Sequence, residues 1–300
     1  MQNIQKFLDK KSKLPKIIVI YWPTASGKTS LSIDIAKFLD SEIIWADSRQ
    51  IYKLLNIWTG KITEVEKQKI PHHMIDILDI DQDYSVGEYK KEAEKIINSL
   101  HTKWKIPIIC WGTGLYIDSI IYNFDIPEVE PDWDYRNKLE EIRLEKWNQH
   151  IWEMLNKVDP KYASILSPAN HRYIIRWLEI FEKTWKSKLD LKWKSTPKYD
   201  VLFLTPYDWD RPKLYYKINS RIEEMFEVGL IDELKSVLKL GYKKTDFWLN
   251  TIWYKEIIEY LDWNLTLEQC KNLVKQHNRN YAKRQLTWFR KYESSKDIII

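Results

Sequence analysis

The chain carries one short segment with a strong structural signature, Trp22-Pro23-Thr24-Ala25-Ser26-Gly27-Lys28-Thr29. It follows an apolar run at 17–21 and precedes an amphipathic run at 30–39. Strand, tight loop and helix in this order are the setting of a phosphate-binding loop, where backbone N–H groups surround an anion. Lys28 would reach the outer phosphates and the Thr29 hydroxyl would help to hold Mg²⁺. Trp22 departs from the pattern G-x-x-x-x-G-K-[ST], which has glycine at this position.

Predicted strands and helices alternate around this loop. Strands are expected at 17–21, 42–46 and 106–110, with helices between them and after the third. This order predicts an α/β fold, namely a P-loop NTPase-like parallel sheet with helices on both faces. Asp47 follows the second strand and Thr113 follows the third, so both fall at carboxyl ends, where such sheets bind ligands. We therefore expect Asp47, Thr113 and the phosphate loop to converge.

Three regions are expected along the chain. An α/β core covers 1–126, a charged helical insertion without clear strands covers 127–199, and 200–300 returns to the core. Capping boxes, in which side chain and backbone bond reciprocally at a helix start, are predicted at Ser85 and Thr266. The remaining elements are a strand at 200–204 and helices at 28–39, 85–100, 114–122, 211–228, 230–240 and 266–292.

Composition excludes several classes of protein. Cys110 and Cys270 are the two cysteines, so no disulfide framework is implied and a reducing compartment fits. The N-terminal residues lack the apolar core of a signal peptide, and no apolar run reaches the ~20 residues of a membrane helix. The net charge of +5 permits a nucleic-acid partner without requiring one. We expect a soluble, cytoplasmic protein, and a monomer.

The last predicted helix has an unusual charge pattern. Lys271, Lys275, Arg279 and Lys283 recur at every fourth residue, and no acid occurs from Lys271 to 292. Helices usually place acids four residues from such bases. A solvated face and a polyanion-binding face both explain the stripe. The interleaved rings of His277, Tyr281, Trp288 and Phe289 favour RNA contact.

A family resemblance rests on a series of blocks that occur in order along the chain. With glycine read at Trp22, Trp58, Trp111 and Trp253, the chain resembles the bacterial tRNA dimethylallyltransferases, also called isopentenyl-tRNA or IPP transferases. The resemblance runs from about Lys16 to Tyr292. The blocks are W-P-T-A-S-G-K-T, D-S-R-Q-I-Y, W-T-G-K, P-H-H-M-I-D-I, W-G-T-G-L-Y, I-W-Y-K-E and Y-A-K-R-Q-L-T-W-F-R.

The resemblance implies a reaction. A dimethylallyl group would pass from dimethylallyl diphosphate to the exocyclic amine of the adenine just 3′ of the anticodon in tRNA. The phosphate loop would hold the diphosphate rather than ATP, with Lys28 and Mg²⁺ on Thr29 stabilising its departure. Asp47 would accept the proton of the amine. The resemblance assigns further contacts as follows: Thr113 to the base or transferring carbon, Ser48, Arg49 and Gln50 to RNA, Arg172 and Arg176 to the anticodon stem-loop, and Arg211 to diphosphate.

Structural explanations stand beside these roles. Asp47 would serve equally to cap the turn after its strand, and Thr113 to shape a glycine-rich turn. His72 and His73 are adjacent and point apart, so a structural role is favoured over a metal site. Arg172 and Arg176, one helical turn apart, are compatible with a solvated face.

Three other functions share these sequence features. A small-molecule kinase uses the same loop for ATP, although the third strand ends in Trp111-Gly112 without an acid for a second metal contact. A prenyltransferase that acts on free adenine nucleotides needs neither the insertion nor the basic helix. An RNA-binding protein with an inactive phosphate loop would accommodate Trp22.

Tryptophan and glycine counts lead to a separate hypothesis. The chain has 7 glycines and 16 tryptophans, whereas average usage predicts about 21 glycines. Trp22, Trp58, Trp111 and Trp253 stand where the resembled family has glycine. A genome that reads UGA as glycine, translated with tryptophan at UGA, explains both observations and predicts glycine at these four positions and at most of the other tryptophans. Trp288 is the exception, because Leu-Thr-Trp-Phe-Arg matches the family as printed. The alternative is that all are true tryptophans in a degenerate homologue.

Overall fold

The computed structural model describes residues 2–21, 23–25, 27–110, 112–127, 129–190, 196–206, 210–244, 246, 249, 253–293 and 298–299. The chain divides into two compact units. The sheet unit comprises Met1–Ile121 and Pro197–Ile300, and the helical unit comprises Tyr122–Thr196. The latter corresponds to the insertion predicted at 127–199. Among the described helices, none is both long and apolar enough to cross a membrane.

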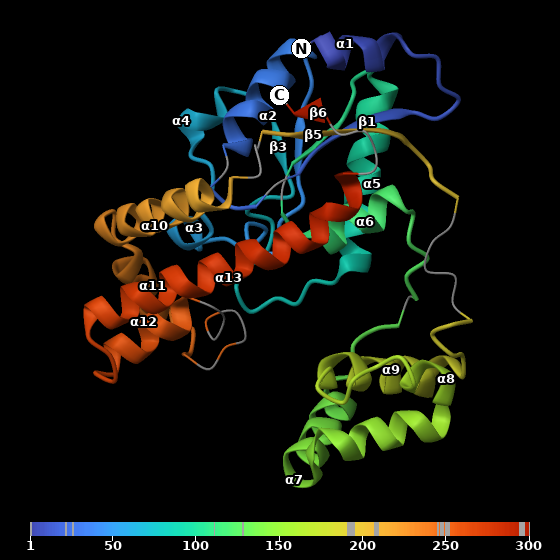
Figure 1. Cartoon of the computed structure of the whole chain (residues 1–300), viewed down its shortest axis with the longest axis vertical. Helices are drawn as coiled ribbons and strands as arrows, with labels where there is room; N and C mark the ends of the chain where they lie inside the picture. The colour runs from blue at the N-terminus through green and yellow to red at the C-terminus, as the bar shows by residue number, and fades with distance from the viewer. Residues whose placement is uncertain are drawn as a thin grey trace. The chain divides into compact units, whose positions relative to one another are not determined.

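A parallel six-stranded sheet forms the centre of the sheet unit (Figure 1). The strand order is β3-β2-β4-β1-β5-β6, and every pairing is parallel. The predicted parallel α/β sheet is therefore confirmed. The strands are β1 (Lys16–Ile20), β2 (Ile43–Trp45), β3 (His72–His73), β4 (Ile108–Cys110), β5 (Asp200–Thr205) and β6 (Ile298–Ile299).

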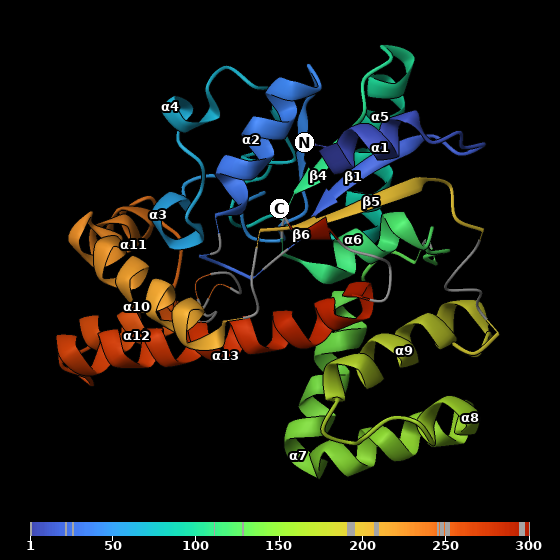
Figure 2. The ribbon, with the colours of Figure 1, turned by 45° about the horizontal axis from the view of Figure 1, so that its top comes forward.

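Both faces of the sheet are buried, as the run of isoleucines and valine in β1 requires. Ile18 and Ile20 join a buried cluster with Ile33 of α2 (Lys28–Phe38). Ile17 and Val19 point to the opposite face, because strand side chains alternate, and they are equally buried. On that second face the Phe203 ring stacks on Tyr292 at 4.8 Å between centroids. The helix that carries Tyr292, α13 (Leu267–Glu293), is the long red helix of Figure 2, beside α10 and α12.

Local capping chemistry sets the helix starts that the sequence predicted. The Ser85 hydroxyl accepts from the Glu88 N–H, and the Glu88 carboxylate accepts from the Ser85 N–H. Thr266 and Gln269 make the same reciprocal pair at the start of α13. The other helices of this unit are α1 (Gln2–Asp9), α3 (Asn56–Thr59), α4 (Glu64–Lys67), α5 (Val86–Thr102), α6 (Gly114–Ile121), α10 (Arg211–Glu227), α11 (Leu230–Lys239) and α12 (Tyr254–Leu261).

The segment after β2 holds more structure than the predicted polar loop. It contains α3, α4 and strand β3, which adds to the sheet beside β2. His73 Nε2 lies 2.7 Å from a carboxylate oxygen of Glu42, and His72 Nδ1 lies 2.7 Å from the carbonyl of Ile70. These contacts fit the structural role expected of the two histidines. A strand of two residues is too short to produce a periodic sequence signal, which explains why it was missed.

The helical unit packs α7 (Trp133–Val158), α8 (Pro160–Ala163) and α9 (His171–Thr184) around its own core. Glu179 is fully buried in α9 and accepts from Arg136 at 3.0 and 2.9 Å. The N–H of Asp132, the residue before α7, donates to the same carboxylate at 2.6 Å. A buried carboxylate needs such partners, so this cluster fixes α9 against the start of α7.

Candidate active site

The segment predicted to be a phosphate loop joins β1 to α2, so the predicted order of strand, loop and helix is confirmed. Gly27 lies at φ 87°, in the left-handed region that favours glycine, and Lys28 is the first residue of α2. Ala25 also has a positive φ, of 63°. The predicted loop residues Trp22 and Ser26 lie outside the described residues. The loop therefore places the N-terminus of α2 at the carboxyl end of β1, the position at which such loops bind anions.

Lys28 is buried inside this loop. Its side chain is turned back, and Nζ donates to the carbonyl of Pro23 at 2.6 Å. Burial lowers the pKa of Lys28 to about 7, an effect that Arg221 reinforces and that Cys110 and Asp47 oppose. An arriving anion would favour the ammonium form in this setting. Lys28 is thus arranged to gain charge when an anion binds.

Asp47 lies just beyond β2 and is 7% exposed. Its Oδ1 accepts from the N–H groups of Arg49 and Gln50, at 2.7 and 3.3 Å. Oδ2 makes no hydrogen bond with the part of the chain that the structure describes. Burial raises the pKa of Asp47, against the lowering effect of these hydrogen bonds and of Arg49 and Lys28. A buried carboxylate with one oxygen held by backbone and a raised pKa is suited to accept a proton.

Thr113 lies beside Asp47, as predicted from their places at strand ends. The Thr113 N–H donates to the carbonyl of Ala46 at 3.0 Å, and its hydroxyl accepts from the Ser48 N–H at 3.0 Å. The neighbouring register of β2 and β4, with Trp45 opposite Cys110, produces this contact. Thr113 thus supports the turn that carries Asp47, which agrees with the structural explanation without testing a substrate contact.

Arg49 and Gln50 are the residues whose N–H groups bind Asp47, and their side chains lie in the same region. Gln50 is 1% exposed, and its Nε2 donates to the carbonyl of Thr59 at 3.1 Å. Its Oε1 is buried without a hydrogen-bond donor among the described residues. Burial lowers the pKa of Arg49, which lies close enough to Asp47 for an electrostatic interaction. Buried acceptors are rarely left unsatisfied in native proteins, so this oxygen marks a polar position that a water or a ligand would complete.

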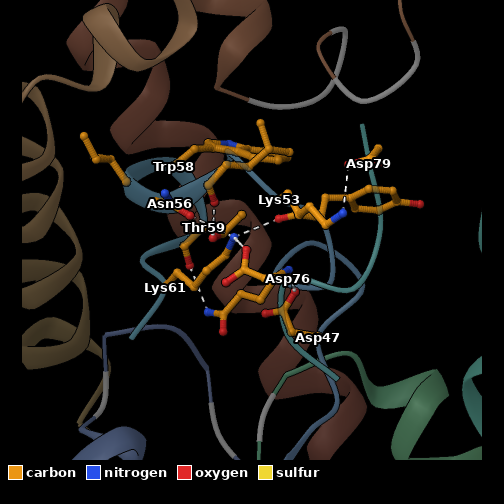
Figure 3. A network of polar contacts seen from close by, with 12 residues as sticks. Asp47, Lys53, Asn56, Trp58, Thr59, Lys61, Asp76 and Asp79 are labelled. Atoms are coloured by element: carbon orange, nitrogen blue, oxygen red, sulfur yellow. Dashed lines mark hydrogen bonds and ion pairs between the residues drawn. The ribbon is translucent and has the colours of Figure 1, made fainter. Parts of the chain in front are cut away.

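A polar network holds the turn whose Thr59 carbonyl binds Gln50 (Figure 3). Lys61 Nζ donates to the carbonyl of Tyr52 at 2.7 Å, to Asn56 Oδ1 at 2.9 Å and to Asp76 at 2.5 Å. From the other side, the carboxylate of Glu233 in α11 accepts from three successive N–H groups at the start of α3, over 2.6–2.9 Å. These contacts hold the turn at 56–61 that supplies the Thr59 carbonyl.

Arg221 of α10 is a site residue that sequence reasoning missed. It is partly buried, and it donates to the Thr24 hydroxyl at 3.0 Å and to the Gly60 carbonyl at 3.3 Å. Its electrostatic interaction with Asp47 opposes the lowering of its pKa by burial. Arg211, which the resemblance assigned to diphosphate, is exposed at the first turn of α10, about 15 Å from Arg221 along the helix axis. Its diphosphate contact stays a prediction.

The basic stripe of α13 has an internal partner. Lys271 and Lys275 both pair with Glu223 of α10, and Arg279 donates to Asn219 at 2.8 Å. The acid missing from α13 is therefore supplied by the neighbouring helix. Lys283, by contrast, is exposed, and so are Arg284 and Arg290. The exposed C-terminal part of α13 is therefore a better candidate for RNA contact than the part that pairs with α10. RNA contacts by Lys275 and Arg279 stay predictions.

The two predicted RNA-binding arginines of the helical unit differ. Arg172 is exposed on α9. Arg176 pairs with buried Glu179 and donates to the carbonyl of Val129 at 3.0 Å. Arg176 therefore has a structural role as well, and any RNA contact would be additional.

The predicted Mg²⁺ is compatible with this site. No cluster of three or more His, Cys, Asp or Glu side chains suited to a metal occurs within the described residues. Mg²⁺ often keeps several waters and takes one or two protein ligands together with substrate phosphates. Thr29, in the first turn of α2 beside Lys28, fits such a sparse protein contribution.

A helix N-terminus and two cations in electrostatic contact with a buried carboxylate, on a P-loop-like fold, fit a group-transfer enzyme. The IPP transferase family matches residues 50–292, and the chain belongs to this family. It is 43% identical to the tRNA dimethylallyltransferase of Alkaliphilus oremlandii, covering 93% of this chain and 90% of that one.

Two solved structures agree with this assignment. A tRNA isopentenylpyrophosphate transferase from Bacillus halodurans is 39% identical, with TM-score 0.66 over 92% of this chain and 86% of the other. A eukaryotic dimethylallyltransferase described as acting on tRNA is 30% identical, with TM-score 0.77 over 92% of this chain and 70% of the other.

Proposed function

We propose that this chain transfers the dimethylallyl group of dimethylallyl diphosphate to the N6 amine of the adenine 3′-adjacent to the anticodon in tRNA. The observation that carries the proposal is the placement of Asp47. A buried carboxylate with a raised pKa interacts electrostatically with both Lys28 and Arg221, which border the phosphate loop. Proton acceptor and leaving-group stabilisers are thus in one site, as an alkyl transfer to an amine requires.

The residues divide the chemistry between the two walls. The bond from the transferring carbon to the diphosphate oxygen breaks, and a bond from that carbon to N6 forms. Lys28, Arg221 and the N–H groups of the loop stabilise the negative charge that develops on diphosphate. Asp47 Oδ2 accepts the proton that N6 loses. Mg²⁺, bound through Thr29 and the diphosphate, would neutralise further charge on the leaving group.

Recognition of the acceptor follows from the polar groups beside Asp47. The unsatisfied Oε1 of Gln50 is suited to accept a hydrogen bond from the adenine amine or from a ribose 2′-hydroxyl of the RNA. An adenine in an anticodon loop leaves its stack at small cost, because loop bases are not held in a duplex. Arg172 and the exposed basic side chains of α13 would contact RNA phosphates. A monomer in the cytoplasm fits this function.

One experiment tests the proposal against its rivals. The protein is incubated with Mg²⁺, dimethylallyl diphosphate and unmodified tRNA, and digested RNA is examined by mass spectrometry for dimethylallyl-adenosine. Parallel reactions contain AMP or ATP with small acceptors. Prenylated adenosine 3′ of the anticodon supports the proposal. Product on AMP alone, or ATP turnover, would overturn it.

The same reactions should be run with a second protein that carries Trp22→Gly, Trp58→Gly, Trp111→Gly and Trp253→Gly. If only the glycine variant is active, the four tryptophans are the cause of the parent chain's inactivity. Inactivity of both proteins would count against the function itself.

A further inference from the structure

Gln285 of α13 bridges two walls of the candidate active site. It is 4% exposed. Its Oε1 accepts from the N–H of Thr24 at 3.3 Å, and its Nε2 donates to the carbonyl of Gly112 at 3.1 Å. One buried amide thus joins segments on either side of the site, and apolar packing does not require this arrangement.

The two bridged segments belong to the two substrates. Thr24 lies in the phosphate loop, and its hydroxyl is held by Arg221. Gly112 precedes Thr113, which binds the N–H of Ser48, the residue after Asp47. Gln285 therefore links the wall proposed for the prenyl donor to the wall proposed for the adenine.

We propose that Gln285 is a positioning residue for the transfer reaction, which sets the spacing between the donor and acceptor walls. This rests on the proposed function. Group transfer requires the reacting atoms to be held about 3–3.5 Å apart, and a displacement of about 1 Å costs roughly 10²-fold in rate. Loss of the bridge should therefore lower kcat more than it weakens either substrate.

The test uses Gln285→Met, which keeps the length of the side chain and removes both hydrogen bonds. We expect kcat per active site to fall about 10- to 100-fold, with KM for donor and tRNA changed by less than about threefold. Active sites are counted by pyrophosphate binding. Gln276→Met makes the same chemical change at an exposed position of α13 and should leave kcat unchanged.

Three outcomes are decisive. A Gln285→Met protein with the kcat of the parent would overturn the proposal. So would a loss confined to melting temperature or to the number of active sites, because that is the signature of a purely structural residue. If neither this chain nor the variant with the four glycine replacements prenylates RNA, the proposed function is refuted instead, and faster amide exchange at Thr24 in Gln285→Met would still show that the bridge is lost.

A second inference rests on backbone geometry alone. Among the residues that the structure describes, five tryptophans have a positive φ, which is uncommon for non-glycine residues and an outlier for bulky ones. They are Trp104 (60°), Trp147 (67°), Trp185 (55°), Trp253 (90°) and Trp263 (62°).

Two of them occupy conformations that strongly favour glycine. Trp147 interrupts α7 with φ 67° and ψ 166°, a region that is essentially restricted to glycine. Trp253, before α12, has φ 90° and ψ −55°, outside the regions allowed to L-residues.

The other three tryptophans end helices. Trp185 is the left-handed C-cap of α9, while Trp104 and Trp263 directly follow the C-caps of α5 and α12. These are the positions at which glycine most often terminates a helix. The side chains are 77%, 95% and 93% exposed, so burial of the indole does not compensate for the strain.

We infer that the native residue at these five positions is glycine. Four of them, all except Trp253, lie outside the motifs that first raised the glycine hypothesis, so the backbone evidence is independent of family resemblance. Trp152 differs, because its indole N–H donates to the carbonyls of Ala163 and Leu166 at 3.0 and 2.9 Å. We assign Trp152 as a true tryptophan.

The nucleotide sequence and the melting temperature test this inference. The five codons should be UGA and the codon of Trp152 should be UGG. In the printed chain, Trp147→Gly and Trp263→Gly should each raise the melting temperature, and the alanine variants should raise it less, because alanine is also strained at positive φ. Trp152→Gly should lower it. UGG at the five positions, or glycine variants that melt lower than their parent, would overturn the inference.

Discussion

The guanidinium of Arg221 lies 3.0 Å from the hydroxyl of Thr24, although 197 positions separate the two residues in the chain. The contact joins α10 to the predicted phosphate loop and places a partly buried cation at the proposed diphosphate site. Arg211 lies on the same helix but is exposed at its first turn. The two arginines therefore allow a matched comparison.

We expect Arg221→Gln to weaken pyrophosphate binding by about 10- to 100-fold, the scale of a lost hydrogen bond from a charged donor. Arg211→Gln should change it by less than about threefold. Calorimetric titration of both variants with pyrophosphate and Mg²⁺ measures the difference. Equal losses in the two variants would restore Arg211 as a diphosphate ligand.

Asp47→Asn should preserve the fold and donor binding but reduce the rate of prenyl transfer by about 10²- to 10⁴-fold, as expected for loss of a proton acceptor. Asparagine keeps an oxygen for the N–H groups of Arg49 and Gln50. Single-turnover rates at saturating tRNA are the measurement. Near-normal activity would show that Asp47 serves only to cap its turn.

The exposed end of α13 should carry the salt dependence of tRNA binding. Replacing Lys283, Arg284 and Arg290 by Gln should reduce the log–log slope of affinity against salt by roughly 0.7–0.9 for each phosphate that is no longer neutralised. The matched control is the double variant Lys271→Gln and Lys275→Gln, which removes the pairs with Glu223. It should lower stability and leave the slope unchanged. A smaller slope in the double variant, with an unchanged slope in the triple variant, would place RNA on the α10 side of the helix.

The lowered pKa of Lys28 predicts that donor binding depends on pH. Its pKa falls from an ordinary 10.5 to about 7 in the folded protein because of burial. Between these values the unfolded chain holds the proton more tightly, so this group makes the free energy of unfolding rise with pH from about 7 to 10.5. Bound diphosphate reverses the preference, since it stabilises the ammonium form.

Pyrophosphate binding at pH 8 should therefore take up protons, and affinity should fall as the pH rises above about 7. Titrations in two buffers of different ionisation enthalpy count the protons. Lys28→Arg stays charged and should show only the proton exchange of pyrophosphate itself. Identical proton counts for parent and variant would mean that Lys28 is already charged in the empty site.

Much of the fold could be predicted because its signals are local. The run of β-branched residues in β1, the loop glycine at Gly27 and the capping pairs at Ser85 and Thr266 each act within a few residues of their own position. Parallel strands also bring their carboxyl ends together, so the meeting of Asp47 with Thr113 followed from their places after β2 and β4.

The rest of the site depends on contacts between distant segments. The basic stripe of α13 contains no acid of its own, but Glu223 of α10 pairs with two of its lysines, Lys271 and Lys275. Arg221, Glu233 and Gln285 act at the site from helices whose sequence periodicity identifies a buried face but not the partner packed against it. Such pairings form when helices dock on the sheet, because side-chain hydrogen bonds depend on three-dimensional spacing and not on sequence order. The sequence by itself therefore determined the sheet, its phosphate loop and the strand-end residues, and only the tertiary structure decided which side chains enclose them.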